Sequence, residues 1–170
     1  MMTKEEISDV DFFVLFKDHP TRTLLLNHPN GFHMISGYLN EMKRHLENNN
    51  YGLYLYYSNN NSIINNTFVG AGIDVWKSYD NVVVDNVVNG KPLVYLEGVV
   101  GGVVEDAGQV VLVRCLNVTV RNNEISDTRT AIELFYSNNT IIENNSMRSN
   151  AFSAIYAVYS CNNIGNGYPL

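Results

Sequence analysis

The sequence predicts an all-β fold: a parallel β-helix of about five to six turns with a short N-terminal α-helical cap. Three features of the chain support this prediction. A pattern of apolar-x-apolar-x-x-Ser-x-Asn-x-x-apolar-x-x-Asn-x-apolar recurs between Leu53 and Leu170. Its copies start about 20 to 23 residues apart, which is too short for two strands and a crossover helix. Their leading apolar residues lie two apart, which is strand periodicity.

The first fifty residues do not repeat. We therefore expect an N-terminal segment, residues 1–50, followed by the repeats, residues 51–170. Phe12 to Phe16 and Thr23 to Leu26 are rich in strand-forming residues and predict two short strands. His19-Pro20 separates the two runs, because proline interrupts regular structure.

Residues 36–47 predict the capping helix, because Leu39, Met42 and Leu46 recur at helical spacing. The end of a β-helix exposes apolar core and unpaired strand edges, so a helix laid across the first turn would protect both. The alternative is that this helix belongs to a separate module that binds a partner.

Each copy of the repeat predicts one turn of the coil, which we call a rung, and positions are counted from its first apolar residue as offset zero. Those first residues are Leu53, Ile73, Val110, Ile132 and Ile155, the last in a decaying copy. Parallel strands stack about 4.8 Å apart, so equivalent residues should form columns. A second buried column is expected at offset ten, from Ile63, Val83, Val120 and Ile142.

The recurring asparagines are suited to the corners of the rungs. Asparagine tolerates the left-handed backbone conformation that a sharp bend requires, and its amide can bond to nearby backbone. Stacked amides can also bond from one rung to the next. Asp80 replaces asparagine at offset seven of one rung.

The long interval between Ile73 and Val110 leaves two interpretations of residues 89–107. A degenerate rung would place Leu93, Tyr95, Val103 and Asp106 at offsets zero, two, ten and thirteen. An inserted hairpin, turning at Gly98 or at Gly101-Gly102, is the alternative.

Several stretches, SNNNSIINNTF, NGKPLVYLEG, NVTVRNNEIS and SNNTIIENNSM, resemble the repeats of the NosD-like parallel β-helix proteins, within the carbohydrate-binding and sugar-hydrolase group. The resemblance covers about residues 51 to 165. It implies a right-handed coil, and it implies an extracellular or cell-surface location. It says little about function, because the repeated residues build the coil.

The composition excludes several classes of partner. A net charge of −6 argues against binding to a nucleic-acid backbone. No apolar stretch is long enough to span a membrane. The first residues, MMTKEEISDVDFF, lack the apolar region of a signal peptide, so we expect either a cytoplasmic chain or a fragment of a longer exported protein.

Cys115 and Cys161 are expected two rungs apart, too far for a disulfide, so both should be free.

A carbohydrate surface is the main functional hypothesis. Odd offsets of the first strand should point outward, and they carry aromatic rings beside carboxylates, which suit the apolar faces and hydroxyls of sugars. The candidate residues for binding a polysaccharide or glycan are Tyr54, Tyr56, Asp74, Trp76, Glu133, Phe135 and Tyr156. They are flanked at offset four by Tyr57, Lys77, Arg114, Tyr136 and Tyr159. The alternative is that the aromatic residues pack beneath the N-terminal segment or a partner chain.

Catalysis is a weaker hypothesis, with Asp74 and Glu133 as the candidate carboxylates. Stacking places them roughly 14 Å apart if the degenerate rung exists, and roughly 10 Å apart if it does not. Inverting glycosidases need about 6.5 to 9.5 Å, so only the second count approaches that range.

A metal site is the third hypothesis, because the NosD-like group is often labelled copper-binding. His28 and His33 are the candidate ligands, although their spacing is not that of a zinc or copper motif. No cofactor is expected. We therefore predict a noncatalytic cell-surface or carbohydrate-binding scaffold, with a polysaccharide-active hydrolase or lyase and a copper-binding protein as alternatives. The weak last rung also predicts self-association through the end of the coil.

Overall fold

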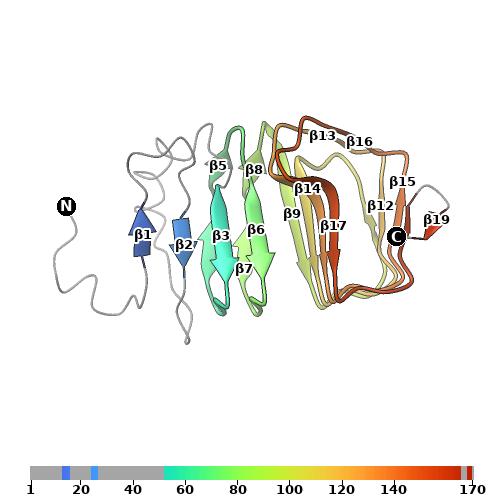
Figure 1. Ribbon diagram of the computed structural model, residues 1–170, viewed down its shortest axis with the longest axis horizontal. Coiled ribbons are helices and arrows are strands. Elements are labelled where there is room, and N and C mark those ends of the chain that lie inside the picture. The colour runs from blue at the N-terminus through green and yellow to red at the C-terminus, as the bar shows by residue number, and fades with distance from the viewer. Residues whose placement is uncertain (1–12, 16–23, 27–51, 166–167, 170) are drawn as a thin grey trace.

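The computed structural model describes residues 13–15, 24–26, 52–165 and 168–169, and every regular element within these ranges is a β-strand. From β1 to β9 the strands follow one another along the long axis of the molecule, and the remaining strands form its far end (Figure 1). The all-β prediction is confirmed for these residues. The helical cap expected over residues 36–47 lies outside them.

Six strands begin the successive rungs. They are β3 (Leu53–Tyr56), β6 (Ile73–Trp76), β9 (Lys91–Glu97), β11 (Gln109–Val113), β14 (Thr130–Phe135) and β17 (Ser153–Val158). Leu53 pairs in parallel with Ile73, and Ile132 pairs in parallel with both Val110 and Ile155. The predicted stacking at offset zero is thus confirmed on either side of residues 89–107, in a coil of about five turns.

Shorter strands form the other sides of the coil. The second strands are β4 (Ser62–Ile64), β7 (Val82–Val84), β10 (Val103–Val104), β12 (Thr119–Arg121), β15 (Ile141–Glu143) and β18 (Ile164–Gly165). The third strands are β5 (Thr67–Phe68), β8 (Val87–Val88), β13 (Glu124–Ser126) and β16 (Ser146–Arg148). At the C-terminal end, β19 (Tyr168–Pro169) pairs antiparallel with β18.

Two strands in the N-terminal segment match the prediction for that region. β1 (Phe13–Leu15) pairs antiparallel with β2 (Leu24–Leu26), and β2 pairs in parallel with β3. The sheet of first strands therefore continues across the expected boundary at residue 50. The division of the chain at that residue stays a prediction.

The asparagines hold the corners as expected. At offset seven, Asn60, Asp80, Asn117, Asn139 and Asn162 all have left-handed φ values between 54° and 58°. At offset thirteen, side-chain amides form ladders with the backbone of the preceding rung. The backbone N–H of Asn66 donates to Asn86 Oδ1 at 2.9 Å, and the backbone N–H of Asn123 donates to Asn145 Oδ1 at 3.0 Å. The repeated asparagines are therefore explained by the coil itself.

Residues 89–107 form a rung, but the predicted register is wrong by one residue. β9 and β10 pair in parallel with β11 and β12, and Val94, not Leu93, lies opposite Val110. The rung begins with a hairpin, because β8 and β9 pair antiparallel around Asn89-Gly90. Both turn residues have positive φ, 50° and 85°, as a tight two-residue hairpin turn requires. The hairpin is thus at neither of the glycine positions that the alternative interpretation proposed.

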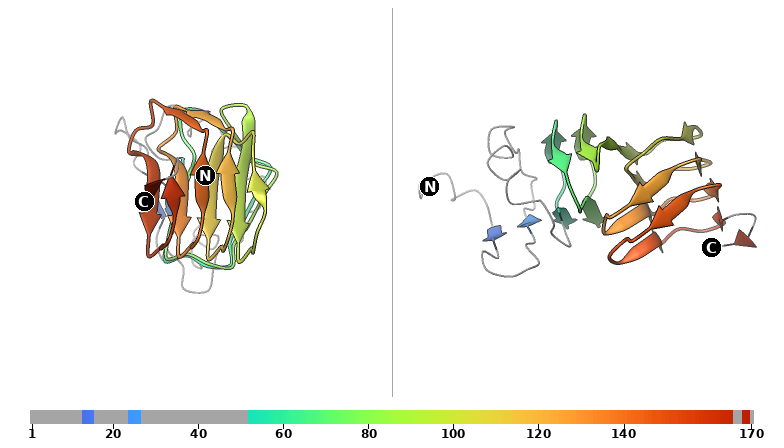
Figure 2. Two further views of the ribbon diagram at one scale, coloured as in Figure 1. Left: turned by 90° about the vertical axis from the view of Figure 1, so that its right-hand side faces the viewer. Right: turned by 90° about the horizontal axis from the view of Figure 1, so that it is seen from above.

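This hairpin divides the solenoid into an N-terminal coil, residues 52–88, and a C-terminal coil, residues 91–165. β9 pairs with β8, so within the described residues β6 ends its sheet without a following parallel strand. The strands of the C-terminal coil are set apart from β3 and β6 in Figure 1 and in the right-hand view of Figure 2. The first strands of the C-terminal coil therefore lie across the open end of the N-terminal coil.

Each coil has its own core, and the junction completes one of them. Val111, Val113 and Phe135 point away from the interior of the C-terminal coil, yet all three are fully buried. They belong to the same cluster as Leu53 and Ile73 of the N-terminal coil. The expectation that odd offsets face solvent is therefore wrong for these strands, because they cover the neighbouring coil.

Gln109 closes the open edge of β6. Its Oε1 accepts from the Ile73 N–H at 2.9 Å, and its Nε2 donates to the carbonyls of Ile73 at 2.7 Å and Thr130 at 2.9 Å. The side chain is fully buried, and a Cβ added to Gly72 would overlap it. This amide side chain thus makes two of the hydrogen bonds that a strand stacked on β6 would otherwise make.

The cysteines behave as predicted, since both are free. Cys115 is buried, and its N–H donates to Ser137 Oγ at 3.0 Å in the offset-five column. Cys161 is exposed in the last rung. Among the described residues there is no helix long and apolar enough to cross a membrane.

Gln109→Leu tests the closure of the β6 edge. The substitution replaces the amide with an apolar side chain of similar size and leaves buried backbone groups of Ile73 unpaired, so the free energy of unfolding should fall by about 2–4 kcal/mol. Urea unfolding measures it. The control Glu124→Leu, at an exposed strand position, should change it by less than about 0.5 kcal/mol. An equally small effect at Gln109 would contradict the assignment.

Candidate functional site

A small pocket lies where the two coils meet. Its volume is about 70 Å³, and its lining comes from β3, β6, β14, β17 and the loops that precede the last two. The lining residues are Tyr54, Asp74, Val75, Trp76, Arg129, Glu133, Phe152 and Tyr156. We call it the junction pocket. Five of the seven residues proposed from the sequence as sugar-binding lie in it.

The remaining two proposed residues lie elsewhere. Phe135 is fully buried and packs against Trp76, with ring centroids 5.6 Å apart. Tyr56 remains partly exposed, in edge contact with Tyr57. The expected outward stripe is therefore not a continuous surface, because the junction buries its middle and gathers the rest around one hollow.

Sequence reasoning missed Arg129 and Phe152. Both precede the first residue of their rung by three positions, and they pack together, with Arg129 Cζ lying 4.6 Å from the centre of the Phe152 ring. A comparison of equivalent offsets in the loops would have paired them. Their place in the pocket, however, depends on how the two coils meet.

The junction also brings Asp74 and Glu133 into one site. The separations of 14 and 10 Å expected from stacking are wrong, because they assumed one continuous coil. In the structure β14 does not stack above β6 but faces its open edge, and Glu133 bonds to the residue after Asp74.

Asp74 is a buried acceptor that is only half satisfied. It is 7% exposed; its Oδ1 accepts from Thr130 Oγ1 at 3.2 Å and lies 3.4 Å from Arg129 Nε. Its Oδ2 is buried and has no hydrogen-bond partner. Burial raises the pKa of Asp74 from 3.8 to about 6, against the opposing effects of Arg129 and Thr130.

Glu133 is buried more deeply and has a structural partner. It is 2% exposed, and its two carboxyl oxygens lie 3.3 and 3.1 Å from the Val75 N–H, which donates to them. Burial, and next the charge of Asp74, raise the pKa of Glu133 well above its usual value. The pair can therefore retain a proton near neutral pH, and Glu133 accepts a hydrogen bond from the second orphaned N–H of β6.

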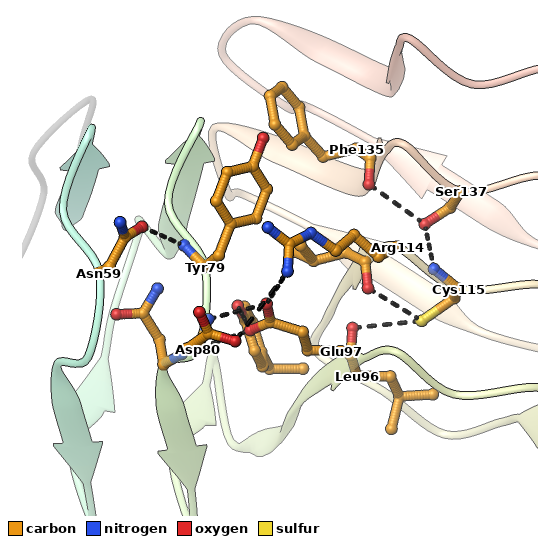
Figure 3. A network of polar contacts seen from close by, with 12 residues as sticks. Asn59, Tyr79, Asp80, Leu96, Glu97, Arg114, Cys115, Phe135 and Ser137 are labelled. Atoms are coloured by element: carbon orange, nitrogen blue, oxygen red, sulfur yellow. Dashed lines mark hydrogen bonds and ion pairs between the residues drawn. The ribbon is translucent and has the colours of Figure 1, made fainter.

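On the other side of the junction, Glu97 has the same role for the turn that follows β6. Its Oε1 accepts from the Asp80 N–H at 2.8 Å, and its Oε2 accepts from the Asn81 N–H at 3.3 Å (Figure 3). The guanidinium of Arg114 lies 4.0 Å from the carboxylate of Asp80 and 4.0 Å from that of Glu97. It also lies 3.7 Å from the centre of the Tyr79 ring. This network is also part of the junction, but it does not line the pocket.

An aromatic and cationic row follows the turn at offset four, as the sequence placed it. Its members, which we call the outer row, are Tyr57, Lys77, Arg114, Tyr136 and Tyr159. All have φ between 47° and 53°, although bulky residues adopt this conformation at a cost. Tyr136 and Tyr159 stack with ring centroids 4.8 Å apart. The outer row is thus a second aromatic surface, separate from the residues that line the junction pocket.

Comparisons with protein-family models cover most of the chain. Residues 25–106 match the family described as periplasmic copper-binding protein (NosD), and residues 103–167 match the family described as right handed beta helix region. The chain is a NosD-like parallel β-helix protein. Its coil is right-handed, as the resemblance implied. No curated protein and no solved structure matches it.

The described part of this NosD-like chain contains no group of three or more His, Cys, Asp and Glu side chains that could hold a metal ion. His28 and His33, the candidate ligands, lie outside the described residues. The junction pocket itself offers two carboxyl groups and an arginine, and a cation beside Asp74 is already supplied by Arg129. What the pocket offers a ligand is hydrogen bonding and aromatic contact.

The raised pKa values predict a stability that depends on pH. A carboxyl group that binds protons more tightly when folded contributes stability at low pH, and this contribution is lost as the pH rises through the folded pKa, about 6 for Asp74. Glu133→Gln mimics the protonated acid and still offers an acceptor to Val75. It should therefore be more stable than the wild type at pH 7, by at least about 1 kcal/mol, and equally stable at pH 4.

Urea unfolding of the two proteins at pH 4 and pH 7 measures this difference. The matched control is Glu124→Gln at an exposed position, which should change little at either pH. A Glu133→Gln protein that is less stable than the wild type at pH 7 would show that the charged carboxylate, not the neutral acid, stabilises the junction.

Proposed function

We propose that this NosD-like protein is a noncatalytic carbohydrate-binding scaffold, and that the junction pocket is its sugar site. The observation that carries the proposal is that Tyr54, Trp76 and Tyr156 line the same pocket as Asp74, whose Oδ2 is buried without a hydrogen-bond partner. Sugars present apolar ring faces together with hydroxyl donors, and this pocket offers aromatic side chains together with a buried acceptor.

The size of the pocket defines how a sugar would bind. A volume of about 70 Å³ has room for about two water molecules, so an exocyclic hydroxymethyl group could enter but a whole pyranose ring could not. The hydroxyl of that group would donate to Asp74 Oδ2. The ring would remain at the rim, against the partly exposed faces of Trp76 and Tyr156.

The noncatalytic part of the proposal rests on Glu133. A glycosidase needs one carboxylic acid that can reach the glycosidic oxygen, whereas Glu133 is 2% exposed and is hydrogen-bonded to the backbone of β6. Its raised pKa is accounted for by its structural position. This part would be overturned if the wild type released reducing sugar from a polysaccharide and Glu133→Gln did not.

The location follows from the family and belongs to the same proposal. The NosD family model describes periplasmic proteins. A periplasmic or extracellular protein meets polysaccharide at the cell surface, which is consistent with a glycan as the ligand.

Trp76→Ala tests the sugar site. The substitution removes an aromatic wall of the pocket, so binding to the glycans that the wild type selects on a glycan array should fall at least about tenfold, or roughly 1.4 kcal/mol. Tyr159→Ala is the matched control, because it removes an exposed aromatic residue that does not line the pocket. Undiminished binding by Trp76→Ala, or an equal loss with Tyr159→Ala, would contradict the assignment.

Copper is the second candidate ligand, favoured by the match to the NosD family model. Its ligands would be His28 and His33. Isothermal titration of micromolar protein with Cu²⁺ should then give heat that disappears in the His28→Ala/His33→Ala double variant and persists in His45→Ala. No heat with the wild type, or heat that survives the double variant, would exclude these ligands.

A further inference from the structure

The rung that contains β9 and β10, the third in the chain, is unusually short. It has a first and a second strand but no third strand. Only Gly108-Gln109 separates Ala107 from Val110, the start of the next rung. In the fourth rung the equivalent interval, from Asn123 to Ile132, holds eight residues and includes β13. The two intervals begin at equivalent positions, because the Ala107 N–H donates to Asn123 Oδ1 at 2.8 Å. The coil therefore lacks one strand between the β8–β9 hairpin and β13.

A hollow of about 330 Å³ lies where this strand is absent. The hairpin contributes Val88, Asn89 and Lys91 to one side of it, and Gly108 lies between. β13 and β16 form the other side. The volume is within the range of ligand sites, about 300–1,000 Å³. None of these residues lines the junction pocket.

One edge of β13 faces this hollow. Within the described residues β13 pairs only with β16. The Asn123 carbonyl accepts from the Ser146 N–H, and the Asp127 N–H donates to the Arg148 carbonyl. Backbone groups alternate between the two edges of a parallel strand, so those of Glu124 and Ser126 point the other way, toward the hollow. A strand edge that no neighbouring strand covers is a template for another strand.

The side chains around the hollow define the chemistry of its occupant. Asn89 Nδ2 donates to the carbonyls of Ser126 at 2.7 Å and Asp127 at 3.2 Å, so these carbonyls are already bonded within the chain and an added peptide would bond to the N–H of Ser126 instead. Lys91 is paired with Asp106 at 3.0 Å. Arg148, on β16, has no carboxylate partner within the described part of the chain, and its Nε donates only to Ser146 Oγ. The free guanidinium favours an acidic group in the occupant.

We propose that the hollow binds a short extended peptide, which takes the place of the missing strand beside β13 and carries an acidic side chain toward Arg148. A peptide backbone presents N–H and carbonyl groups at the spacing of the strand edge, which is how strand addition gives affinity. A sugar has no matching repeat of donors and acceptors. This binding site is independent of the proposed sugar site.

A phage-displayed library of random heptapeptides, panned on the full chain, tests the proposal. Enriched peptides should contain Asp or Glu, and a synthetic copy should bind with a Kd that fluorescence anisotropy can measure. Ser126→Pro removes the backbone N–H that faces the hollow and should weaken binding about tenfold, whereas Ser126→Ala keeps that N–H and should not. Arg148→Met should weaken binding of the acidic peptide and abolish the preference over its amide analogue.

A second measurement keeps the test independent of how Ser126→Pro folds. Versions of the peptide N-methylated at successive residues are titrated into the wild type, and alternate positions should lose binding because only alternate N–H groups face β13. Hydrogen exchange of the Ser126 amide should slow with the peptide bound. No enriched peptide, equal binding by all the methylated versions, or unchanged exchange at Ser126 would overturn the proposal.

Discussion

The closure of the open edge of β6 is the constraint on which the rest of the structure depends. A strand edge at the end of a solenoid normally meets solvent or a cap, but this one lies inside the molecule, where an unpaired backbone group costs about 1–3 kcal/mol. Gln109 and Glu133 of the C-terminal coil satisfy it, and Glu97 of the same coil accepts from the turn that follows β6. Two of these are acids, and burying Glu133 is itself costly, so its proton is held more tightly than usual.

This closure also separates the residues of the candidate site that the fold requires from those that are available to a ligand. Asp74 and Glu133 look like a catalytic pair when only their type and their raised pKa values are considered. Glu133, however, accepts a hydrogen bond that the fold requires, and its burial explains its pKa. Asp74 is different, because Oδ2 has no structural partner. A polar atom that the fold leaves unsatisfied in a pocket lined by aromatic residues is the better indication of a ligand.

Much of the coil could be predicted from the sequence, because stacking repeats the same local contacts in every rung. The apolar columns, the left-handed asparagines and the two N-terminal strands all follow from such contacts. The register of the third rung could not be fixed, since Leu93, Val94, Tyr95 and Leu96 form an apolar run without alternation. Asn89-Gly90 is a strong hairpin signal, but the repeat conceals it. The site residues were identified as an outward stripe, whereas their convergence depends on the angle between coils, which no local pattern encodes.

The two proposed sites share a physical origin. In a regular rung every strand is hydrogen-bonded above and below, so only outward side chains can contact a ligand. Where the repeat is interrupted, the hairpin at Asn89-Gly90 creates a strand edge and the short third rung creates a gap. The same interruption exposes backbone groups at β13 and gathers aromatic residues around Asp74. Membership of the NosD-like family accounts for the coil, and the binding properties particular to this chain should therefore be sought where its repeat fails.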